Sequence, residues 1–377
     1  MSSSVNKSED QITTTQAAII VINYMLGAGI LTLPRTMAKA VGTPDVWISL
    51  LISGGIVFVA GVIVARLCMR FPGKTIFQFT SEITGKWIAY LIGFALFSYF
   101  ITISAFEIRV MAEVTRLYLL EGTPVWAYVM VFMWVGFYLV LGGINSLARL
   151  YEIILPITLV IFVMVILLSI RLFEIDNLRP VLGMGIVPVL KGIKPSLLSF
   201  TGFEAMLVVT AFMKHPSKGV KAVIYGISVP LVIYLITLIM VIGGLSLDGT
   251  VTKTWPTLDL LRSFEAEGLI FERFESLLLV IWIMQIFSTF TITHYAASLG
   301  AAQLLNKHKL TPFLLVLLPV NYMIAMLPKD INQTFFLGDM LGNLSLILFC
   351  VTPLVLLIIS MIRKKGGKPN EHLTEHT

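Results

Sequence analysis

Long apolar segments, separated by short polar or Gly/Pro-rich stretches, fill the sequence between residues 14 and 362. Most of these segments are about 20 residues or longer, the length that an α-helix needs to cross the hydrocarbon core of a bilayer. They lack the polar/apolar alternation that is typical of membrane β-barrel strands. The pattern therefore predicts an all-α polytopic membrane protein with ten transmembrane helices. The predicted spans cover residues 14–38, 44–67, 84–118, 124–142, 149–171, 188–212, 220–244, 274–304, 311–328 and 334–362.

Composition supports a membrane protein and argues against an enzyme. Hydrophobic residues make up 57% of the 377 positions and charged residues 13%, whereas soluble domains have roughly a quarter of their residues charged. The first fifteen residues lack the features of a cleavable signal peptide, so the first apolar segment is expected to remain as a helix. Neither Cys68 nor Cys350 has the spacing of a disulfide or metal pair. Without a nucleophile elbow, phosphate loop or metal-spaced His/Cys cluster, we expect no catalytic, cofactor or metal site.

The positions of lysine and arginine predict the orientation of the chain in the membrane. Basic clusters that follow the second, sixth, eighth and tenth predicted helices place both termini in the cytoplasm. These clusters are Arg66/Arg70/Lys74, Lys214/Lys218/Lys221, Lys307/Lys309 and Arg363/Lys364/Lys365/Lys368. The net charge of +6 then reflects this asymmetry and contact with anionic lipid rather than nucleic-acid binding.

An even number of helices divides the chain into two halves with a loop between them. The predicted parts are a polar cytoplasmic N-terminal tail (1–13), a first five-helix repeat (14–171), an outer connecting loop (172–187), a second five-helix repeat (188–362) and a basic cytoplasmic C-terminal tail (363–377). Within the second repeat, residues 245–273 form an outer loop in which Leu258, Leu261 and Phe264 predict a short amphipathic helix. This helix could cover the outer mouth of a site, or the loop could lie at the interface without a gating role.

Glycine interrupts the first and sixth predicted helices near their middle. The residues at these interruptions are Gly27, Ala28, Gly29 and Ile30 in the first helix and Phe200, Thr201, Gly202 and Phe203 in the sixth. Each helix begins one five-helix half, and interrupted helices at matching positions indicate a transporter-type binding site at the membrane midplane. The freed amides favour a carboxylate and the freed carbonyls favour an ammonium group or cation, so a zwitterionic amino acid would satisfy both. Alternatively, Gly27 and Gly29 only allow close helix packing.

Glu204 directly follows the second interruption. An acid in mid-membrane costs about 2.5–3.5 kcal/mol on insertion scales, so such a residue usually faces a polar cavity or a partner. The sequence leaves three roles open for Glu204: binding a proton, holding the unwound segment in a gating role, or a purely structural hydrogen bond to the freed amides.

Two further helices present polar or aromatic faces. The eighth helix has a stripe spaced by three and four residues, and the third helix has a similar aromatic face. The stripe consists of Gln285, Ser288, Thr291, Tyr295 and Ser298, and the face of Tyr99, Thr102 and Phe106. Either face could line a ligand site or pack against a neighbouring helix. Ser288 and Thr289 could offer oxygens to sodium, but with no acidic residue beside them sodium is not expected.

Several motifs resemble known membrane proteins. The run from Gly27 to Pro34 (Gly-Ala-Gly-Ile-Leu-Thr-Leu-Pro), with Gly202-Phe-Glu204, resembles the amino acid–polyamine–organocation transporter superfamily, whose members have a leucine-transporter-like inverted repeat of five plus five helices. Other motifs are similar to a narrower branch, the spore germination permease family, which comprises the B subunits of bacterial endospore germinant receptors. These motifs are Arg70-Phe-Pro-Gly-Lys74, Leu178-Arg-Pro-Val-Leu-Gly-Met-Gly185 and Glu272-Arg-Phe-Glu275.

This resemblance implies a nutrient sensor of the spore inner membrane. The ligand would be a small nutrient, and the partners would be a membrane-embedded A subunit and a lipoprotein C subunit. Carried onto this chain, the ligand site comprises both interruptions, with Tyr99, Thr291 and Tyr295 around them, and binding would trigger germination. The alternative function is a proton-coupled amino acid permease, with Glu204 in the proton path.

Overall fold

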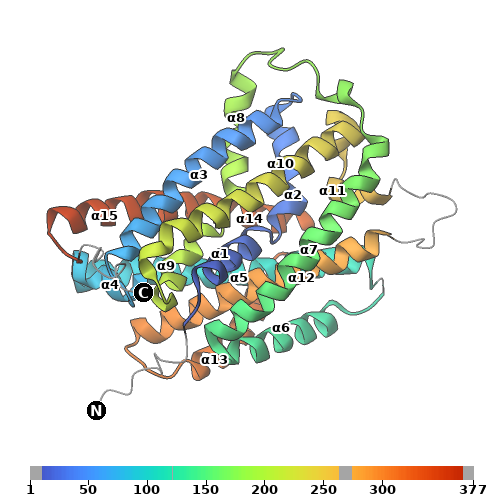
Figure 1. Ribbon diagram of the computed structural model, residues 1–377. Coiled ribbons are helices and arrows are strands. Elements are labelled where there is room, and N and C mark those ends of the chain that lie inside the picture. The colour runs from blue at the N-terminus through green and yellow to red at the C-terminus, as the bar shows by residue number, and fades with distance from the viewer. Residues whose placement is uncertain (1–10, 121, 263–273, 368–377) are drawn as a thin grey trace, which may run out of the picture.

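The computed structural model describes residues 11–120, 122–262 and 274–367, and these residues are predominantly helical (Figure 1). Among them the only strand-type pairing is an isolated bridge between Ile12 and Met213, which confirms the all-α class. The α-helices are α1 (Thr14–Met25), α2 (Gly29–Val41), α3 (Val46–Met69), α4 (Ile76–Thr84), α5 (Lys86–Tyr118), α6 (Val125–Leu141), α7 (Gly143–Ser169), α8 (Val187–Ser199), α9 (Met206–Val209), α10 (Gly219–Thr252), α11 (Pro256–Arg262), α12 (Phe274–Leu304), α13 (Thr311–Met326), α14 (Ile331–Ser345) and α15 (Thr352–Ile362). A π-helical turn, Leu346–Val351, joins α14 to α15.

Six continuous helices in the described part of the chain are long and apolar enough to cross a membrane, and the number is eight if each of two bent pairs is one span. The bent pairs are α1 with α2, at 52°, and α8 with residues 203–212, at 42°. Two shorter apolar helices, α6 and α13, have 17 and 16 residues. Each of the ten predicted segments therefore overlaps an apolar helix, while the count of ten membrane crossings stays a prediction.

Two local features were not foreseen from the apolar pattern. Residues 76–84 form a separate helix, α4, because the Gln78 side chain accepts a hydrogen bond from the Thr75 amide (3.1 Å), and Gly85, with φ of 90°, ends it before α5 begins. A helix start of this kind is a capping box, which the sequence Thr-x-x-Gln already contains. The second feature is α10, which continues to Thr252 across a kink at Ser246.

The two bent pairs lie in the middle of the bundle. In Figure 1, α3 and α10 lie on one side of α1, and α5 and α12 lie on the other. The shorter helices α6 and α13 pack on the outside of α5 and α12. Segments near both ends of the chain meet at one end of the bundle, where the Ile12 amide donates to the Phe212 carbonyl (2.9 Å) and Arg70 donates to the Lys365 carbonyl (2.9 Å). We call this the terminal end and the opposite one the loop end, because residues 172–187 connect the helices there.

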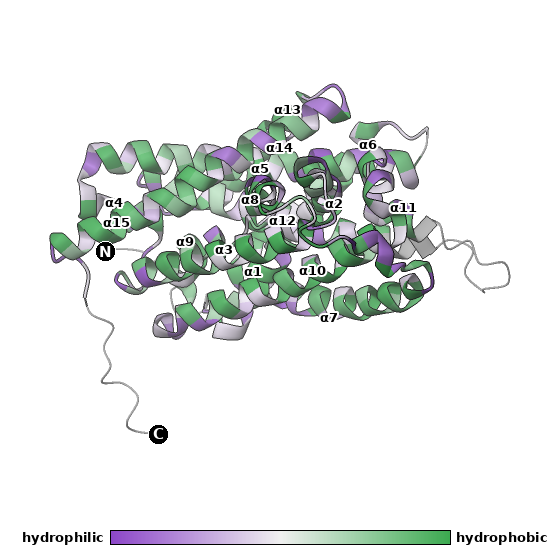
Figure 2. Ribbon diagram, turned by 90° about the horizontal axis from the view of Figure 1, so that it is seen from above, coloured by the Kyte–Doolittle hydropathy of each residue, from purple (hydrophilic) through white to green (hydrophobic). Residues whose placement is uncertain are grey.

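Hydrophobic residues, coloured green in Figure 2, dominate the helices of the bundle. Large hydrophobic side chains stand almost fully exposed, including Trp87 (91%), Tyr138 (81%) and Leu91 (72%). Monomeric soluble proteins do not expose apolar area on this scale, whereas a lipid bilayer solvates it. Helices satisfy their own backbone hydrogen bonds, as the bilayer interior requires. The protein is therefore a multi-pass membrane protein.

The predicted amphipathic helix lies partly within the described residues. Helix α11 begins at Pro256, and Leu258 is fully buried, while α11 packs against α2, α10 and α12. Phe264 and the rest of the predicted loop up to residue 273 lie outside the described residues, as do 1–10 of the N-terminal tail and 368–377 of the C-terminal tail. The position of α11 beside α2 places it near the break in the first bent pair.

Candidate functional site

The first break frees backbone groups that side chains of other helices then bind. Helix α1 ends at Met25 and α2 begins at Gly29. The Tyr24 carbonyl accepts a hydrogen bond from the Thr289 hydroxyl of α12 (3.0 Å). The Ala28 amide donates to both carboxyl oxygens of Glu107 on α5 (3.2 and 3.4 Å). The break thus lies where predicted, and it is fixed by groups that are distant in the sequence.

The second break is organised around Glu204, which is fully buried. One carboxyl oxygen accepts from the Gly202 amide (2.6 Å), and the other accepts from the hydroxyls of Tyr24 (3.0 Å) and Tyr99 (3.2 Å). Tyr24 belongs to α1 and Tyr99 to α5, so Glu204 joins this break to two other helices. Of the roles that the sequence left open, the hydrogen bond to a freed amide is present in the structure.

Tyr234 of α10 links the two breaks directly. Its hydroxyl lies within hydrogen-bonding reach of the Met25 carbonyl and the Ser199 carbonyl, the latter at 3.1 Å. Met25 and Ser199 are the last residues of α1 and α8, so one side chain contacts the freed carbonyl end of both half-helices. The two breaks are therefore held together by one tyrosine hydroxyl.

Close approach at the first break requires glycine. A Cβ at Gly27 would lie 2.4 Å from the Thr289 hydroxyl oxygen and 3.2 Å from Glu107, and a Cβ at Gly29 would lie 3.1 Å from the Ser199 carbonyl oxygen. The distance at Gly27 is shorter than a real Cβ contact, and the distance at Gly29 is so tight that the Ser199 backbone would have to shift. The two interpretations of these glycines, a broken helix and close packing, therefore both describe this structure.

A cavity of about 240 Å³ lies between the breaks on their loop-end side. It is bounded by α2, α5, α8 and α14, and Thr254 also contributes to its wall. Four candidate site residues line it, and so do other polar residues that the sequence did not single out. The candidates are Ala28, Gly29, Tyr99 and Thr201, and the additional polar residues include Thr32, Arg35, Glu107, Ser199 and Asp339. The volume suits a small metabolite, since the pockets that bind drug-sized ligands have volumes of about 300 Å³ or more.

The other candidate residues lie elsewhere around the breaks. Ile30 and Gln285 line a second cavity of about 40 Å³. Phe203 and Glu204 border a third, smaller cavity, which they share with Thr201. The Phe200 ring packs edge-on against Tyr234, with ring centroids 5.4 Å apart. Gly27, Gly202, Ser288, Thr291 and Tyr295 are absent from the described lining of the 240 Å³ cavity.

The polar stripe of α12 faces neighbouring helices. The Tyr151 hydroxyl of α7 lies 2.7 Å from both the Ser288 carbonyl and the Thr291 hydroxyl, and Gln285 donates to Thr158 (2.6 Å). Tyr295 packs near Phe212, with ring centroids 6.2 Å apart. The α12 hydroxyl that binds the end of α1 is that of Thr289, which lies beside the stripe. In sequence, only its polar character and its place next to Ser288 pointed to it.

Glu107 is one of several site residues that the sequence did not single out. It lies on the third-helix face predicted from Tyr99 and Phe106, one residue beyond Phe106, and both of these residues line the same cavity. The helical period places Tyr99, Ile103 and Glu107 one above another. This four-residue spacing was the signal in the sequence from which Glu107 could have been identified.

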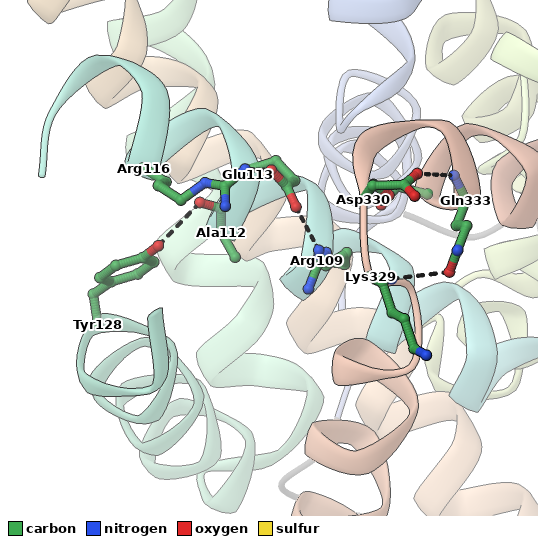
Figure 3. A network of polar contacts seen from close by, with 9 residues as sticks. Arg109, Ala112, Glu113, Arg116, Tyr128, Lys329, Asp330 and Gln333 are labelled. Carbon is green, nitrogen blue, oxygen red and sulfur yellow. Dashed lines mark hydrogen bonds and ion pairs between the residues drawn. The ribbon is translucent and has the colours of Figure 1, made fainter. Parts of the chain in front are cut away.

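The loop-end half of α5 also contains an ion-pair network around the buried Glu113 (Figure 3). Glu113 pairs with Arg109 (2.5 Å) and Arg116 (2.9 Å), and the Tyr128 hydroxyl of α6 donates to the Ala112 carbonyl (3.2 Å). Figure 3 also shows the start of α14, where Asp330 accepts from the Gln333 amide (2.9 Å). Glu113 is thus neutralised by two arginines, in contrast to Glu107.

The bent pairs and the arrangement around them define the class of membrane protein with the leucine-transporter-like fold. The solved structure of MhsT in complex with L-phenylalanine superimposes with a TM-score of 0.69 at 11% identity, covering 94% of this chain and 99% of that one.

Sequence comparison specifies the family. A family model described as "Spore germination protein" matches residues 11–334. Spore germination protein YndE of Bacillus subtilis (strain 168) is 52% identical over 358 residues, which are 95% of this chain and 98% of that protein. Spore germination protein A2 of the same organism is 36% identical, over 94% of this chain and 97% of that protein. The chain belongs to the spore germination permease family. The family and the fold together identify a receptor or transporter rather than an enzyme.

Proposed function

We propose that the protein is the nutrient-sensing B subunit of a spore germinant receptor, and that it binds a small polar ligand, most simply an amino acid, in the 240 Å³ cavity. The observation that supports this function is the position of the cavity against both breaks in a chain of the spore germination permease family. The chain would cross the spore inner membrane ten times as two inverted five-helix repeats, with both termini in the cytoplasm. Its partners would be a membrane-embedded A subunit and a lipoprotein C subunit.

The signal would be a change in the population of open and closed forms of the cavity. A ligand shifts such an equilibrium only as far as its affinity differs between the two forms. Because Tyr234 and Glu204 connect the end of α1 to the second break, closure of the cavity on a ligand would move the two breaks together. A coupling free energy of about 1–3 kcal/mol would be enough to change the contacts with the partner subunits.

In spores that carry Gly29→Val, the release of dipicolinate after nutrient addition is expected to be at least tenfold slower. The valine side chain would enter the space between the Ser199 carbonyl and the Tyr234 hydroxyl, which lie 3.1 and 3.2 Å from the position of a Cβ. Release of dipicolinate after nutrient addition, in spores with this gene as the only copy of its type, measures the effect.

Gly55→Val is the matched control, because a Cβ at Gly55 of α3 has no atom within 4 Å. This variant should respond like the unmodified protein at equal abundance in the spore membrane. A normal nutrient response of Gly29→Val at equal abundance would contradict the assignment of the cavity.

A second function, proton-coupled amino acid permease, is favoured by the buried carboxyl of Glu204 at the second break. Purified protein in liposomes distinguishes the two functions. Proton-driven accumulation of labelled amino acid without any partner subunit would support the permease. Binding without accumulation would support the sensor.

A further inference from the structure

We propose that the cavity recognises the ammonium group of an amine, and that Glu107 is the side chain that binds it. This inference rests on the proposed function and specifies the polarity of the ligand. It reverses the expectation from the broken helices alone, in which a ligand carboxylate meets the amide end of the half-helix.

The amide end of α2 already holds a carboxylate that belongs to the protein. Ala28 is the N-cap residue of α2, directly before Gly29, and its amide donates to both oxygens of Glu107. Free amides at a helix N-terminus are the usual site for a bound anion. A ligand carboxylate at this amide would stand directly beside Glu107, and like charges repel strongly where water is scarce. A carboxylate is therefore disfavoured at this end of the cavity.

Glu107 differs from the other two buried glutamates of the described chain. Glu113 pairs with two arginines, and Glu204 accepts from two hydroxyls and an amide. In the described part of the chain, Glu107 has the Ala28 amide as its hydrogen-bond donor and no cation within 4 Å. A carboxylate can accept about four hydrogen bonds. Glu107 is 4% exposed and lines the cavity, so its unused capacity is available to a ligand in the cavity.

An ammonium group matches this capacity. It supplies three donors and one positive charge, and it would turn an uncompensated buried carboxylate into a hydrogen-bonded ion pair, the form in which such charges are tolerated. Neutral donors such as hydroxyls would satisfy the hydrogen bonds but leave the charge uncompensated. The chemistry therefore favours an amine over a sugar or a carboxylic acid without an amine.

The other charged side chains of the cavity wall do not oppose this polarity, because two of them, Arg35 and Lys39, are cations and one, Asp339, is an acid. Arg35 of α2 and Asp339 of α14 both line the cavity, and among the described residues they form no ion pair with each other. The Nε atom of Arg35 is buried without a hydrogen-bond partner, and its guanidinium lies over the Phe335 ring at 5.5 Å. Arg35 is two turns from Ala28, about 10 Å along the helix. The carboxylate of an amino acid bound at Glu107 would thus point towards a cation.

The experiment measures how ligands shift the unfolding midpoint of the detergent-purified full-length protein. The probes form two sets, L-alanine with L-alaninamide and propionate, and L-leucine with L-leucinamide and 4-methylpentanoate. Each amide keeps the amine and loses the free carboxylate, and each acid lacks the amine. We expect stabilisation by the amino acid and the amide of at least one set, and none by the acid. Glu107→Gln should weaken both at least tenfold, whereas Glu82→Gln, at the exposed Lys74 pair, should not.

Stabilisation by the acids but not by the amides would overturn the inference and leave the proposed function standing. An unchanged affinity of the Glu107→Gln variant for the amines would also overturn the inference and leave the proposed function standing. No stabilisation by any probe would count against both. If Glu107→Gln fails to fold, Glu107→Asp replaces it: the carboxylate is retained on a shorter side chain, so amine preference should persist with lower affinity, and loss of that preference would contradict the inference.

Discussion

Replacing Glu204 by alanine is expected to lower the unfolding free energy by about 3 kcal/mol or more, because a buried donor left without a partner costs about 1–3 kcal/mol. Three donors would lose their acceptor, namely the Gly202 amide and the hydroxyls of Tyr24 and Tyr99. The substitution also leaves a void at a residue that is fully buried. The unfolding midpoint of the purified protein, compared with that of the unmodified chain, gives the effect.

The single tyrosine variants separate the contributions to this effect. Tyr24→Phe and Tyr99→Phe each remove one donor and leave the carboxyl bound by the others, so each should cost about 1 kcal/mol. Glu82→Ala is the control, because it removes a partner of an exposed ion pair, worth about 0–1 kcal/mol. An unfolding midpoint of Glu204→Ala no lower than that of Glu82→Ala would show that Glu204 does not stabilise the second break.

Among the described glycines, Gly202 is the position at which substitution by alanine is expected to lower the stability of the folded protein most. Gly202 has φ of +139°, which side-chain-bearing residues rarely adopt, and an added Cβ would lie 2.5 Å from Met25 Cγ and 2.9 Å from the Met25 amide nitrogen. Backbone strain of about 1–3 kcal/mol adds to an overpacking cost of about 1–3 kcal/mol. Loss of folded protein from the membrane fraction, or a strongly lowered unfolding midpoint, would record the effect.

Gly42→Ala isolates the strain from the steric clash. Gly42 has φ of +67°, but a Cβ there has no atom within 4 Å, so only the conformational cost of about 1–2 kcal/mol remains. The expected order of stability is therefore the unmodified protein, then Gly42→Ala, then Gly202→Ala. Equal stability of the two variants would mean that the first and second breaks do not contact each other at Gly202 and Met25.

The comparison of Glu107 with Glu204 explains why one buried acid was found from the sequence and the other was not. Glu204 follows a glycine interruption, so its neighbours in the sequence already mark it as unusual. Glu107 lies in the continuous helix α5, among Ile, Phe and Arg residues, without any local interruption. Its importance arises from the Ala28 amide, 79 residues away, and such a contact depends on how two helices are rotated against each other.

The sequence by itself determined the main transmembrane helices and the positions at which two of them are interrupted. Apolar length forces helices in lipid, and glycine interruptions marked both breaks, at Gly27 and at Gly202, which has Glu204 beside it. These properties are local. Only the tertiary structure decided which polar side chains meet the freed backbone. Thr289 reaches Tyr24 while its neighbour Ser288 contacts Tyr151, because successive residues point about 100° apart around a helix. Packing fixes that rotation through contacts between distant helices, and no local pattern contains it.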